Sequence, residues 1–560
     1  MRRSGLLVIA ALASVGATKP PAYDVIIRGG TIYDGTGAKP VTGDVAITRD
    51  RIVKVGRVTG TAKRTIDVRG LAVAPGFINM LSWATESLIA DGRSMGDIKQ
   101  GVTLEVMGEG DSMGPLNPAM KADAVKRQGD VKYPITWTTL RQYQDGLVAK
   151  GISPNIASFV GTTTIRIHEL GEGDVDPTPE QLKQMQNLVR SAMNEGAVGV
   201  GSSLIYAPAN FAETPELIAL ATASAKCGGM YISHVRSEGD RLLEAVDELI
   251  EIARASGGPA EIYHLKQAGA ANWSKQAAVI AKVESARAAG IRITADMYNY
   301  TAGATGLDAS MPLWVQAGGL EQWIARLKDP ATRAKVIAEM KDPKPSWENL
   351  RLRAGSPDKV LFLSFKNPAL KPLTGKTLAE VAAMRGTSPE DTAIDLVIED
   401  GSRVGTAYFL MDEANVARQT ALPWVSFGSD AESQAPEGAF LLSATHPRAY
   451  GNVARLLGKY VHDEKTTSLA DAVRRLSGFP AANLGIKDRG VLKVGNYADL
   501  AIFDPAAIAD TATYAKPQSY AVGMRHVFVN GVQVLKDGEH TGAKPGRVVT
   551  GPGLGLCPAG

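Results

Sequence analysis

The chain has 560 residues, of which 44% are hydrophobic and 21% charged, and its formal net charge is only +3. This length exceeds one ordinary core, so we expect a large domain together with a smaller one. The hydrophobic content is that of a folded globular protein and excludes extended disorder, and the weak net charge gives no electrostatic basis for binding nucleic acid.

The first residues have the pattern of an export signal. Two arginines at positions 2 and 3 precede a short apolar run over residues 5–13, and small residues follow at positions 15–17. This order predicts a signal peptide over residues 1–17, which is too short to span a membrane. We find no later segment with the hydrophobicity of a membrane span, so we expect a periplasmic or secreted protein.

The two cysteines lie far apart in the chain. Cys227 ends a helical run, whereas Cys557 lies in a tail rich in glycine and proline. A disulfide between them is one alternative, but we favour a buried free thiol at Cys227. Neither position has the spacing of a zinc ribbon.

Both ends of the chain have the pattern of short strands. Residues 23–70 and 489–550 alternate apolar runs with turns that carry glycine and aspartate, and Asn530-Gly531 between two apolar runs is a strong hairpin signal. Two such segments most simply form one small β-sandwich. A larger domain, residues 71–488, would then be inserted between them.

The middle of the chain alternates short apolar segments with helical patterns. Eight segments are expected to be strands: 71–78, 102–107, 155–160, 197–201, 230–234, 260–265, 291–297 and 424–429. Residues 240–258 typify the helices, with apolar residues at helical spacing and Gly257 at the end. Eight β/α units predict an α/β fold, a (β/α)8 TIM barrel. Residues 311–420 are too long for a loop and predict an insertion, or lid subdomain, between strands 7 and 8.

Three polar residues stand at the carboxyl ends of predicted strands, where the active site of such a barrel forms. His234 ends the fifth strand, His264 ends the sixth and Asp430 follows the eighth. Imidazole nitrogens are good zinc ligands, and a nearby carboxylate can act as a general base. A lone histidine at a strand end is more often a packed core residue. Two histidines and an aspartate at one face favour a metal site.

Longer motifs extend this interpretation over nearly the whole chain. Among them are DVIIRGGTIYDGTG, VAPGFI, GVTLEVMGEG, ISHVRSEG, HLK, ADMYNYTAG, FGSD, HPRAYG and GVLKVGNYADLAIFDP. As a set they resemble the amidohydrolase superfamily and, within it, the D-aminoacylase (N-acyl-D-amino-acid deacylase) branch. The resemblance implies one tightly held zinc, bound by histidines from strands 5 and 6 and by a cysteine after strand 2. It also implies that an aspartate from strand 8 acts as acid and base.

The first strand departs from the family pattern. Its His-x-His maps onto Asn79 and Leu81, so the second metal position is lost. Asn79 and Ser82 stand where ligands are missing, and they could donate hydrogen bonds to an oxyanion or line the pocket. An ordinary packing role for both is the alternative.

The second strand departs as well. The family cysteine falls at Gly110, and we expect the neighbouring Glu109 to replace it as a ligand, with Glu105 as the alternative. Together with His234 and His264, Glu109 would supply two nitrogens and one oxygen and leave a fourth position for water.

Further residues are expected, by the resemblance, to bind the carboxylate of an N-acylated amino acid: Tyr206, Lys266, Tyr298, Tyr300 and Arg448. Arginine fits a carboxylate with two parallel hydrogen bonds, and lysine supplies a point charge. Core packing is the alternative for the tyrosines. Arg236 and Glu238 are expected to pair with each other.

We therefore expect a zinc-dependent hydrolase that cleaves a linear amide of an N-acyl-amino acid, favouring D-configured substrates or dipeptides that contain a D-amino acid. Metal-activated water would attack, with Asp430 as general acid and base. Three alternatives stay open: hydrolysis of a cyclic or aryl amide at the same site, an inactive binding protein of this fold, and carbohydrate cleavage by two facing carboxylates. The partner is a small-molecule amide, and an oligomer is not predicted.

Overall fold

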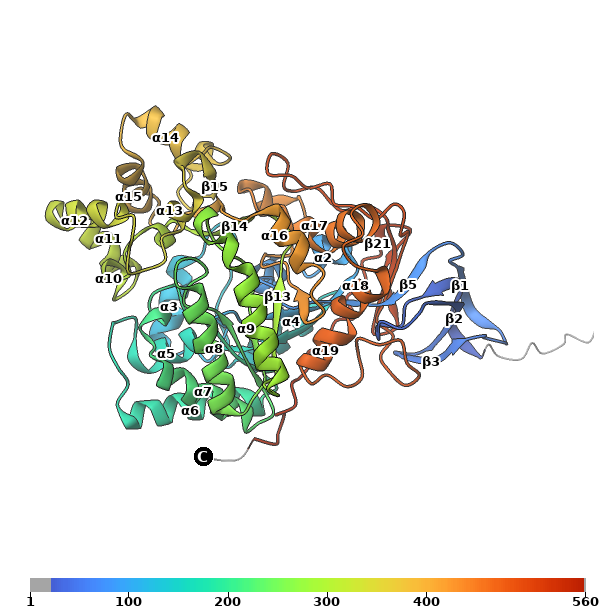
Figure 1. Cartoon of the computed structure of the whole chain (residues 1–560). Helices are drawn as coiled ribbons and strands as arrows, with labels where there is room; N and C mark the ends of the chain where they lie inside the picture. The colour runs from blue at the N-terminus through green and yellow to red at the C-terminus, as the bar shows by residue number, and fades with distance from the viewer. Residues whose placement is uncertain (1–21, 558–560) are drawn as a thin grey trace, which may run out of the picture.

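An eight-stranded parallel barrel forms the centre of the molecule (Figure 1), whose computed structural model describes residues 22–557. The barrel strands, with the third interrupted at Phe159, are β6 (Phe77–Asn79), β7 (Val102–Met107), β8 and β9 (Asn155–Ser158 and Val160–Gly161), β10 (Gly199–Ser203), β11 (Met230–His234), β12 (Ala260–Ile262), β13 (Ile293–Met297) and β17 (Val425–Phe427). They pair in the orders β6-β7-β8 and β9-β10-β11-β12-β13-β17. The backbone N–H of Met80 donates to the carbonyl of Phe427 at 3.1 Å, which joins β6 to β17 and closes the barrel. The predicted fold class is confirmed.

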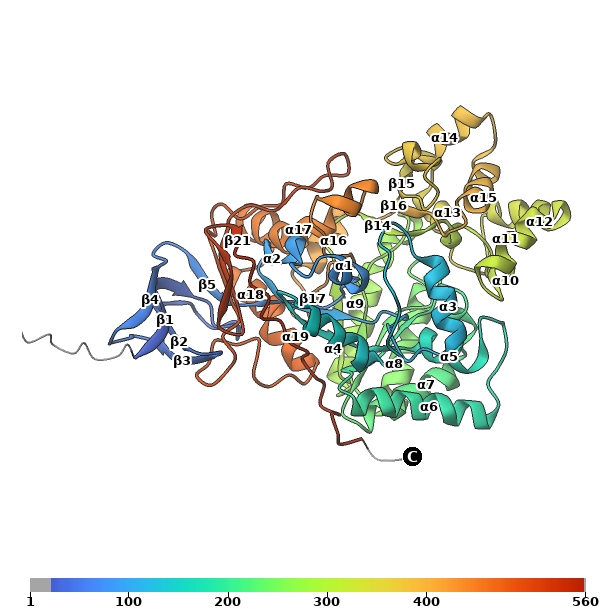
Figure 2. The ribbon, with the colours of Figure 1, turned by 180° about the vertical axis from the view of Figure 1, so that it is seen from behind.

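Helices cover the outside of the barrel (Figures 1 and 2). They include α4 (Leu140–Lys150), α5 (Thr162–Leu170), α6 (Pro179–Asn194), α7 (Thr214–Ala225), α8 (Leu242–Ser256), α9 (Gln276–Ala288), α18 (Leu469–Leu476) and α19 (Gly478–Asn483). Helix α8 shows why the sequence folds this way, because Leu242, Val246 and Leu249 share its buried face and Gly257 ends it in the left-handed conformation (φ 71°). Shorter helices lie in the connections: α1 (Thr85–Ala90), α2 (Met95–Ile98), α3 (Pro118–Arg127) and α17 (Arg448–Arg455).

The two ends of the chain meet in one nine-stranded sheet beside the barrel (Figure 1). Its strands are β1 (Tyr23–Ile32), β2 (Val41–Thr48), β3 (Arg51–Gly56), β4 (Ala62–Asp67), β5 (Ala72–Pro75), β18 (Leu500–Phe503), β19 (Met524–Val529), β20 (Val532–Lys536) and β21 (Glu539–His540). Strand β18 pairs with β5, so the C-terminal strands continue the N-terminal sheet. Asn530 and Gly531 both have positive φ (50° and 77°) in the predicted hairpin between β19 and β20.

The predicted strand 71–78 is divided between the two parts of the molecule. Its first half, β5, belongs to the terminal sheet, and its second half, β6, begins the barrel. Gly76 separates them, because a Cβ at this position would lie 2.1 Å from Oγ1 of Thr103. Close approach of the Thr103 side chain to the backbone at this corner therefore requires glycine.

The long segment between β13 and β17 is an insertion with its own sheet. Strands β14 (Ala302–Gly306), β16 (Gly405–Phe409) and β15 (Val360–Ser364) pair in that order, accompanied by α10 (Leu313–Gln316), α11 (Leu320–Lys328), α12 (Pro330–Met340), α13 (Leu350–Ala354), α14 (Leu378–Arg385), α15 (Pro389–Asp400) and α16 (Glu413–Gln419). The insertion begins earlier than the predicted residue 311, because β14 pairs with β16 along its whole length.

The C-terminal tail runs along the amino-terminal ends of the barrel strands. Val549 and Gly551 donate backbone hydrogen bonds to the carbonyls of Ile156 (2.8 Å) and Gly196 (2.9 Å). Cys557 then forms a disulfide with Cys227, with the two Cα atoms 4.8 Å apart. The expectation of a free thiol at Cys227 was wrong, because the tail returns to the barrel.

Two expectations concern export and membranes. The predicted signal peptide, residues 1–17, lies outside the described residues. Within residues 22–557, none of the helices combines the length and the hydrophobicity needed to cross a bilayer.

Candidate metal centre and active site

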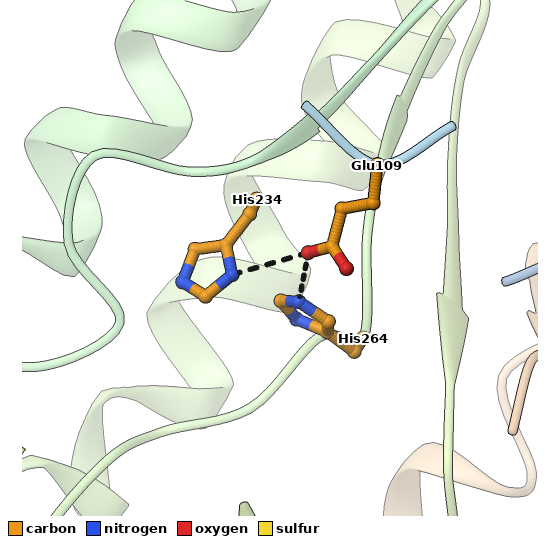
Figure 3. Close-up of side chains that lie close together, drawn as sticks. All are labelled: Glu109, His234 and His264. Carbon is orange, nitrogen blue, oxygen red and sulfur yellow. Dashed lines mark hydrogen bonds and ion pairs between the residues drawn. The ribbon is translucent and has the colours of Figure 1, made fainter. Parts of the chain in front are cut away.

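Three side chains from separate strands converge at the carboxyl end of the barrel (Figure 3). His234 is the last residue of β11, His264 lies two residues after β12, and Glu109 lies two residues after β7. One ligand atom from each lies within 4.8 Å of the others, and all three residues are buried. Neighbouring parallel strands thus deliver the predicted pair of histidines to one point.

Glu109 stands between the two imidazole rings. Its Oε1 is 2.8 Å from Nε2 of His264 and 3.3 Å from Nδ1 of His234, and the rings are nearly perpendicular, with centroids 4.4 Å apart. Two imidazole nitrogens and one carboxylate oxygen are a donor set that suits zinc and leaves a fourth position open. These residues therefore fit the metal that the sequence motifs imply.

The backbone at Gly110 explains why the ligand comes from Glu109. Gly110 has φ +70°, and a Cβ built there would lie 1.9 Å from Oγ of Ser203, so a cysteine does not fit at this position. Glu105 lies deeper in the barrel, where Asn79 Nδ2 (3.1 Å) and Ser94 Oγ (2.9 Å) donate to its carboxylate. Glu109, and not Glu105, reaches the histidines.

Asp430 lies beside this group, three residues after β17. Its φ of 49° is in the left-handed region, where a non-glycine residue is uncommon and often functional. Its Oδ1 accepts a hydrogen bond from Nε1 of Trp83 at 3.1 Å, and its Oδ2 pairs with a terminal nitrogen of Arg448 at 2.9 Å. The carboxylate is held at both oxygens.

Opposing charges set the protonation of the three acids and bases nearest the centre. Burial by itself would raise the pKa of Glu109, but facing His264 and His234 overcome it and hold the pKa below its usual value. Burial and Lys266 would lower the pKa of His264, but Glu109 and Glu238 outweigh them and raise it to about 10. Burial raises the pKa of Asp430, which Arg448 only partly offsets. A cation bound here would take the place of a proton on His264.

A second carboxylate lies behind both histidines. Glu238 Oε1 is 3.0 Å from Nδ1 of His264, and its Oε2 is 3.7 Å from Nε2 of His234. The buried ammonium of Lys266 pairs with Glu238 and lies 2.6 Å from Nδ1 of His264. Lys266 is thus held close to the centre by an acid, instead of pointing freely into the mouth.

The expected pair of Arg236 and Glu238 is not formed. Arg236 donates instead to Glu248 on α8, at 2.9 Å from Nε and 2.8 Å from NH2. It also donates to the backbone carbonyls of Asn210 and Ala212. Arg236 therefore ties the loop after β10 to α8 and lies outside the metal site.

Of the other residues predicted to bind substrate, some lie beside the metal residues and one does not. The Tyr206 ring lies 5.3 Å from the His234 ring, and the Tyr298 ring lies 4.3 Å from the guanidinium carbon of Arg448. Tyr300 does not join them, because its hydroxyl donates to Asp510 at 3.1 Å. Tyr206, Tyr298 and Arg448 border the metal residues, whereas Tyr300 faces another part of the protein.

Arg448 has free hydrogen-bonding capacity although it is buried, with 2% of its surface exposed. One terminal nitrogen, NH2, contacts Asp430, while Nε and NH1 have no hydrogen-bond partner among residues 22–557. Buried donors without partners are costly, so two unpaired guanidinium nitrogens at this place are available to a ligand with acceptor oxygens.

Trp83 reaches the centre, and Asn79 and Ser82 do not. The Asn79 amide is occupied by Glu105 and Ser429, and Ser82 Oγ accepts from a backbone N–H. The indole Nε1 of Trp83 lies 3.1 Å from Glu109 Oε2 and 3.1 Å from Asp430 Oδ1. Trp83 is not among the residues predicted from the sequence, although residues 79, 81 and 83 share one face of an extended strand, a pattern that could indicate it.

Comparison with known proteins decides the family. The chain matches the Amidohydrolase family over residues 64–535. It belongs to this family. Among curated amidohydrolase relatives, it is 31% identical to the D-aminoacylase of Alcaligenes xylosoxydans xylosoxydans over 94% of this chain and 97% of the relative. The N-acyl-D-glutamate deacylase of the same organism is 30% identical over 94% and 96%.

Solved amidohydrolase structures agree. The crystal structure of a D-aminoacylase superposes with a TM-score of 0.78 at 31% identity and covers 94% of this chain and 100% of that one. An N-acyl-D-glutamate deacylase from Bordetella bronchiseptica, solved with zinc and a phosphonate inhibitor, gives 0.77 at 28% identity over 94% and 99%. A D-hydantoinase shares the fold, with a TM-score of 0.53 at 16% identity.

These comparisons confirm the resemblance stated from the sequence. The chain is a metal-dependent amidohydrolase that acts on carbon–nitrogen bonds other than peptide bonds. Its barrel and terminal β domain are those of the family.

Proposed function

We propose that this protein hydrolyses the amide bond of N-acyl-D-amino acids, with one zinc ion held by Glu109, His234 and His264. The observation that carries the proposal is the position of Glu109 Oε1 between two imidazole nitrogens, next to Asp430. The relatives that match over almost the whole chain are a D-aminoacylase and deacylases of N-acyl-D-glutamate and N-acyl-D-aspartate. They support the D configuration.

The chain's own residues supply the proton transfers. When bound, zinc polarises the scissile carbonyl and lowers the pKa of a water molecule to about 7. Asp430 takes a proton from the attacking water and returns it to the departing amine nitrogen. Burial raises the pKa of Asp430 and thereby makes its carboxylate a better proton acceptor. Trp83 and Arg448 hold this carboxylate in one orientation throughout.

Arg448 provides recognition of the substrate carboxylate. Its Nε and NH1 have no partner among residues 22–557, and each can donate a single hydrogen bond to a carboxylate oxygen of the substrate, while NH2 stays on Asp430. Tyr298 supports the guanidinium from one side. The same arginine thus links the bound amino acid to the proton-transferring residue, which sets the distance between the carboxylate and the scissile amide.

The insertion between β13 and β17 serves as a lid over this mouth. Its Arg403 places the guanidinium carbon 5.0 Å from the ring centroid of Tyr206, and the carbonyl of Leu410 accepts hydrogen bonds from the loop after β12. The insertion therefore borders the side of the mouth from which a substrate enters, and it can exclude water during hydrolysis.

Export to the periplasm or beyond is part of the proposal. The predicted signal peptide supports it, and so does the disulfide between Cys227 and Cys557, because disulfides persist mainly in oxidising compartments.

The test combines metal analysis with a substrate panel. Wild-type protein is expected to hold one zinc per chain and to hydrolyse N-acetyl-D-amino acids faster than their L-enantiomers. The His234→Ala/His264→Ala double variant should hold no zinc. Asp430→Asn should keep the zinc and lose kcat by at least about 100-fold. Wild type that binds no zinc would end the proposal, and zinc without any activity on the panel would end its substrate assignment.

A further inference from the structure

The two carboxylates of the centre share one hydrogen-bond donor. Glu109 turns Oε1 to the histidines and Oε2 to the indole of Trp83. Asp430 turns Oδ1 to the same indole and Oδ2 to Arg448. The indole N–H thus stands between the metal-binding acid and the proton-transferring acid, 3.1 Å from each.

The backbone fixes Trp83 relative to Asp430. The N–H of Trp83 donates to the carbonyl of Ala431 at 3.0 Å, and the N–H of Asp430 donates to the carbonyl of Leu81 at 2.8 Å. The two residues therefore lie on hydrogen-bonded neighbouring segments that extend β6 and β17. The indole cannot leave Asp430 without breaking these bonds or changing its rotamer.

The chemistry of the indole limits what this position can do. An indole N–H is a donor only and has no lone pair for a cation, whereas an imidazole at the same place could bind one. Two carboxylate oxygens that converge on one point would otherwise attract a second divalent cation. With Trp83 between them, that point is filled by a neutral donor that satisfies both.

We propose that Trp83 is a positioning residue that fixes Glu109 and Asp430 relative to each other and closes the second cation position. This inference rests on the proposed one-zinc hydrolase. The first metal site can therefore persist in a chain that lacks the His-x-His. A hydrogen-bond donor, the indole of Trp83, takes the place of a second ion as the link between Glu109 and Asp430.

The first test removes only the indole N–H. In Trp83→Phe, Glu109 is no longer held at Oε2, so zinc affinity, measured by competition with a chromophoric chelator, should fall by about 10- to 100-fold. The kcat should fall by a similar factor, with KM changed less than about threefold. Trp424→Phe is the matched control, because it removes an indole N–H that also donates to a carboxylate, Glu284 Oε1 at 3.5 Å, but lies just before the start of β17, at the opposite end of the strand. It should leave both quantities at wild-type values.

The second test introduces a metal ligand at position 83. Trp83→His places an imidazole nitrogen near Glu109 Oε2 and Asp430 Oδ1, so equilibrium dialysis at excess zinc should show two equivalents per chain, against one for wild type. Zinc affinity of Trp83→Phe within about twofold of wild type would overturn the positioning role. One equivalent in folded Trp83→His would overturn the closure of a second site. Wild type without zinc would instead remove the proposed function on which the inference rests.

Discussion

Glu109 is the residue on which the metal centre depends most, because its two oxygens serve different partners. We expect Glu109→Gln to lower zinc affinity at least about 100-fold, since an amide oxygen is a weaker ligand than a carboxylate. Glu105→Gln is the matched control: it changes a buried acid four residues earlier that contacts Asn79 and Ser94. Its zinc affinity should stay near that of wild type. Competition with a chelator measures the zinc affinity of both variants. If Glu105→Gln lost more affinity than Glu109→Gln, Glu105 would be the ligand.

Arg448 has two tasks that substrate choice can separate. Arg448→Ala removes the carboxylate contact and also frees Asp430, so kcat/KM for an N-acetyl-D-amino acid should fall by about 10³. The corresponding C-terminal amide offers no carboxylate. With this substrate, kcat/KM of the variant should fall only about 10-fold, which is the part of the effect that acts through Asp430. Steady-state kinetics on the pair of substrates gives the difference. Equal losses would show that Arg448 does not bind the carboxylate.

At the scale of single residues, the sequence could identify the histidines because each ends an apolar strand whose geometry is known. It could not decide between Glu105 and Glu109, because both lie on the same face of the β7 segment and only the loop at Gly110 separates their positions. Trp83 was missed because a tryptophan next to an apolar strand is normally read as a core residue.

At the scale of elements, strand β12 carries a buried acid that lowers the stability of the barrel at neutral pH. Burial raises the pKa of Glu261 to about 7, although Thr294, Asn483 and Ser426 donate to it. The folded protein therefore holds a proton that the unfolded chain, with a pKa near 4.5, has already lost. Stability from this group is full below about pH 4.5 and is lost as the pH rises to about 7.

Glu261→Gln removes this titration. The side-chain oxygen of the glutamine can still accept the hydrogen bonds from Thr294 and Asn483, and its NH2 group can donate to Ser426. We expect the variant to be more stable than wild type at pH 8, by about 3 kcal/mol from the shift, and nearly equal to it near pH 4.5. Thermal melts at both pH values measure this. A gain that is the same at both pH values would contradict the assignment.

The elements themselves were largely predictable, because each barrel strand is a short apolar run between a helix and a turn. Two boundaries were not. Residues 71–78 form one continuous apolar run, but the corner at Gly76 gives half of it to each domain. The insertion starts at β14 because of pairing with β16, a contact across about a hundred residues that no local pattern shows.

At the scale of the whole molecule, the disulfide closes a segment of 330 residues. Cross-links stabilise mainly by restricting the unfolded chain, and more so for long segments. We expect Cys557→Ser to lose about 2–5 kcal/mol of stability. Addition of a reductant should lower the melting temperature of wild type to that of the variant and leave the variant unchanged. If Cys557→Ser has the same melting temperature as oxidised wild type, the disulfide contributes nothing to stability.

The joining of the two chain ends in one small β domain was predictable from their matching strand patterns. The course of the tail was not, because its hydrogen bonds to Ile156 and Gly196 are made by the backbone and leave no mark in the sequence. For the same reason, the sequence indicates the disulfide between Cys227 and Cys557 only as an alternative to a free thiol.

The position of the tail decides how the enzyme can be handled. Because it is fastened beneath the strand starts as far as Cys557, opposite the insertion (Figures 1 and 2), a fusion partner or resin linker carried beyond Cys557 would start from the side away from the opening. Protein captured on a bead by that end would present its reactive face to the surrounding solution.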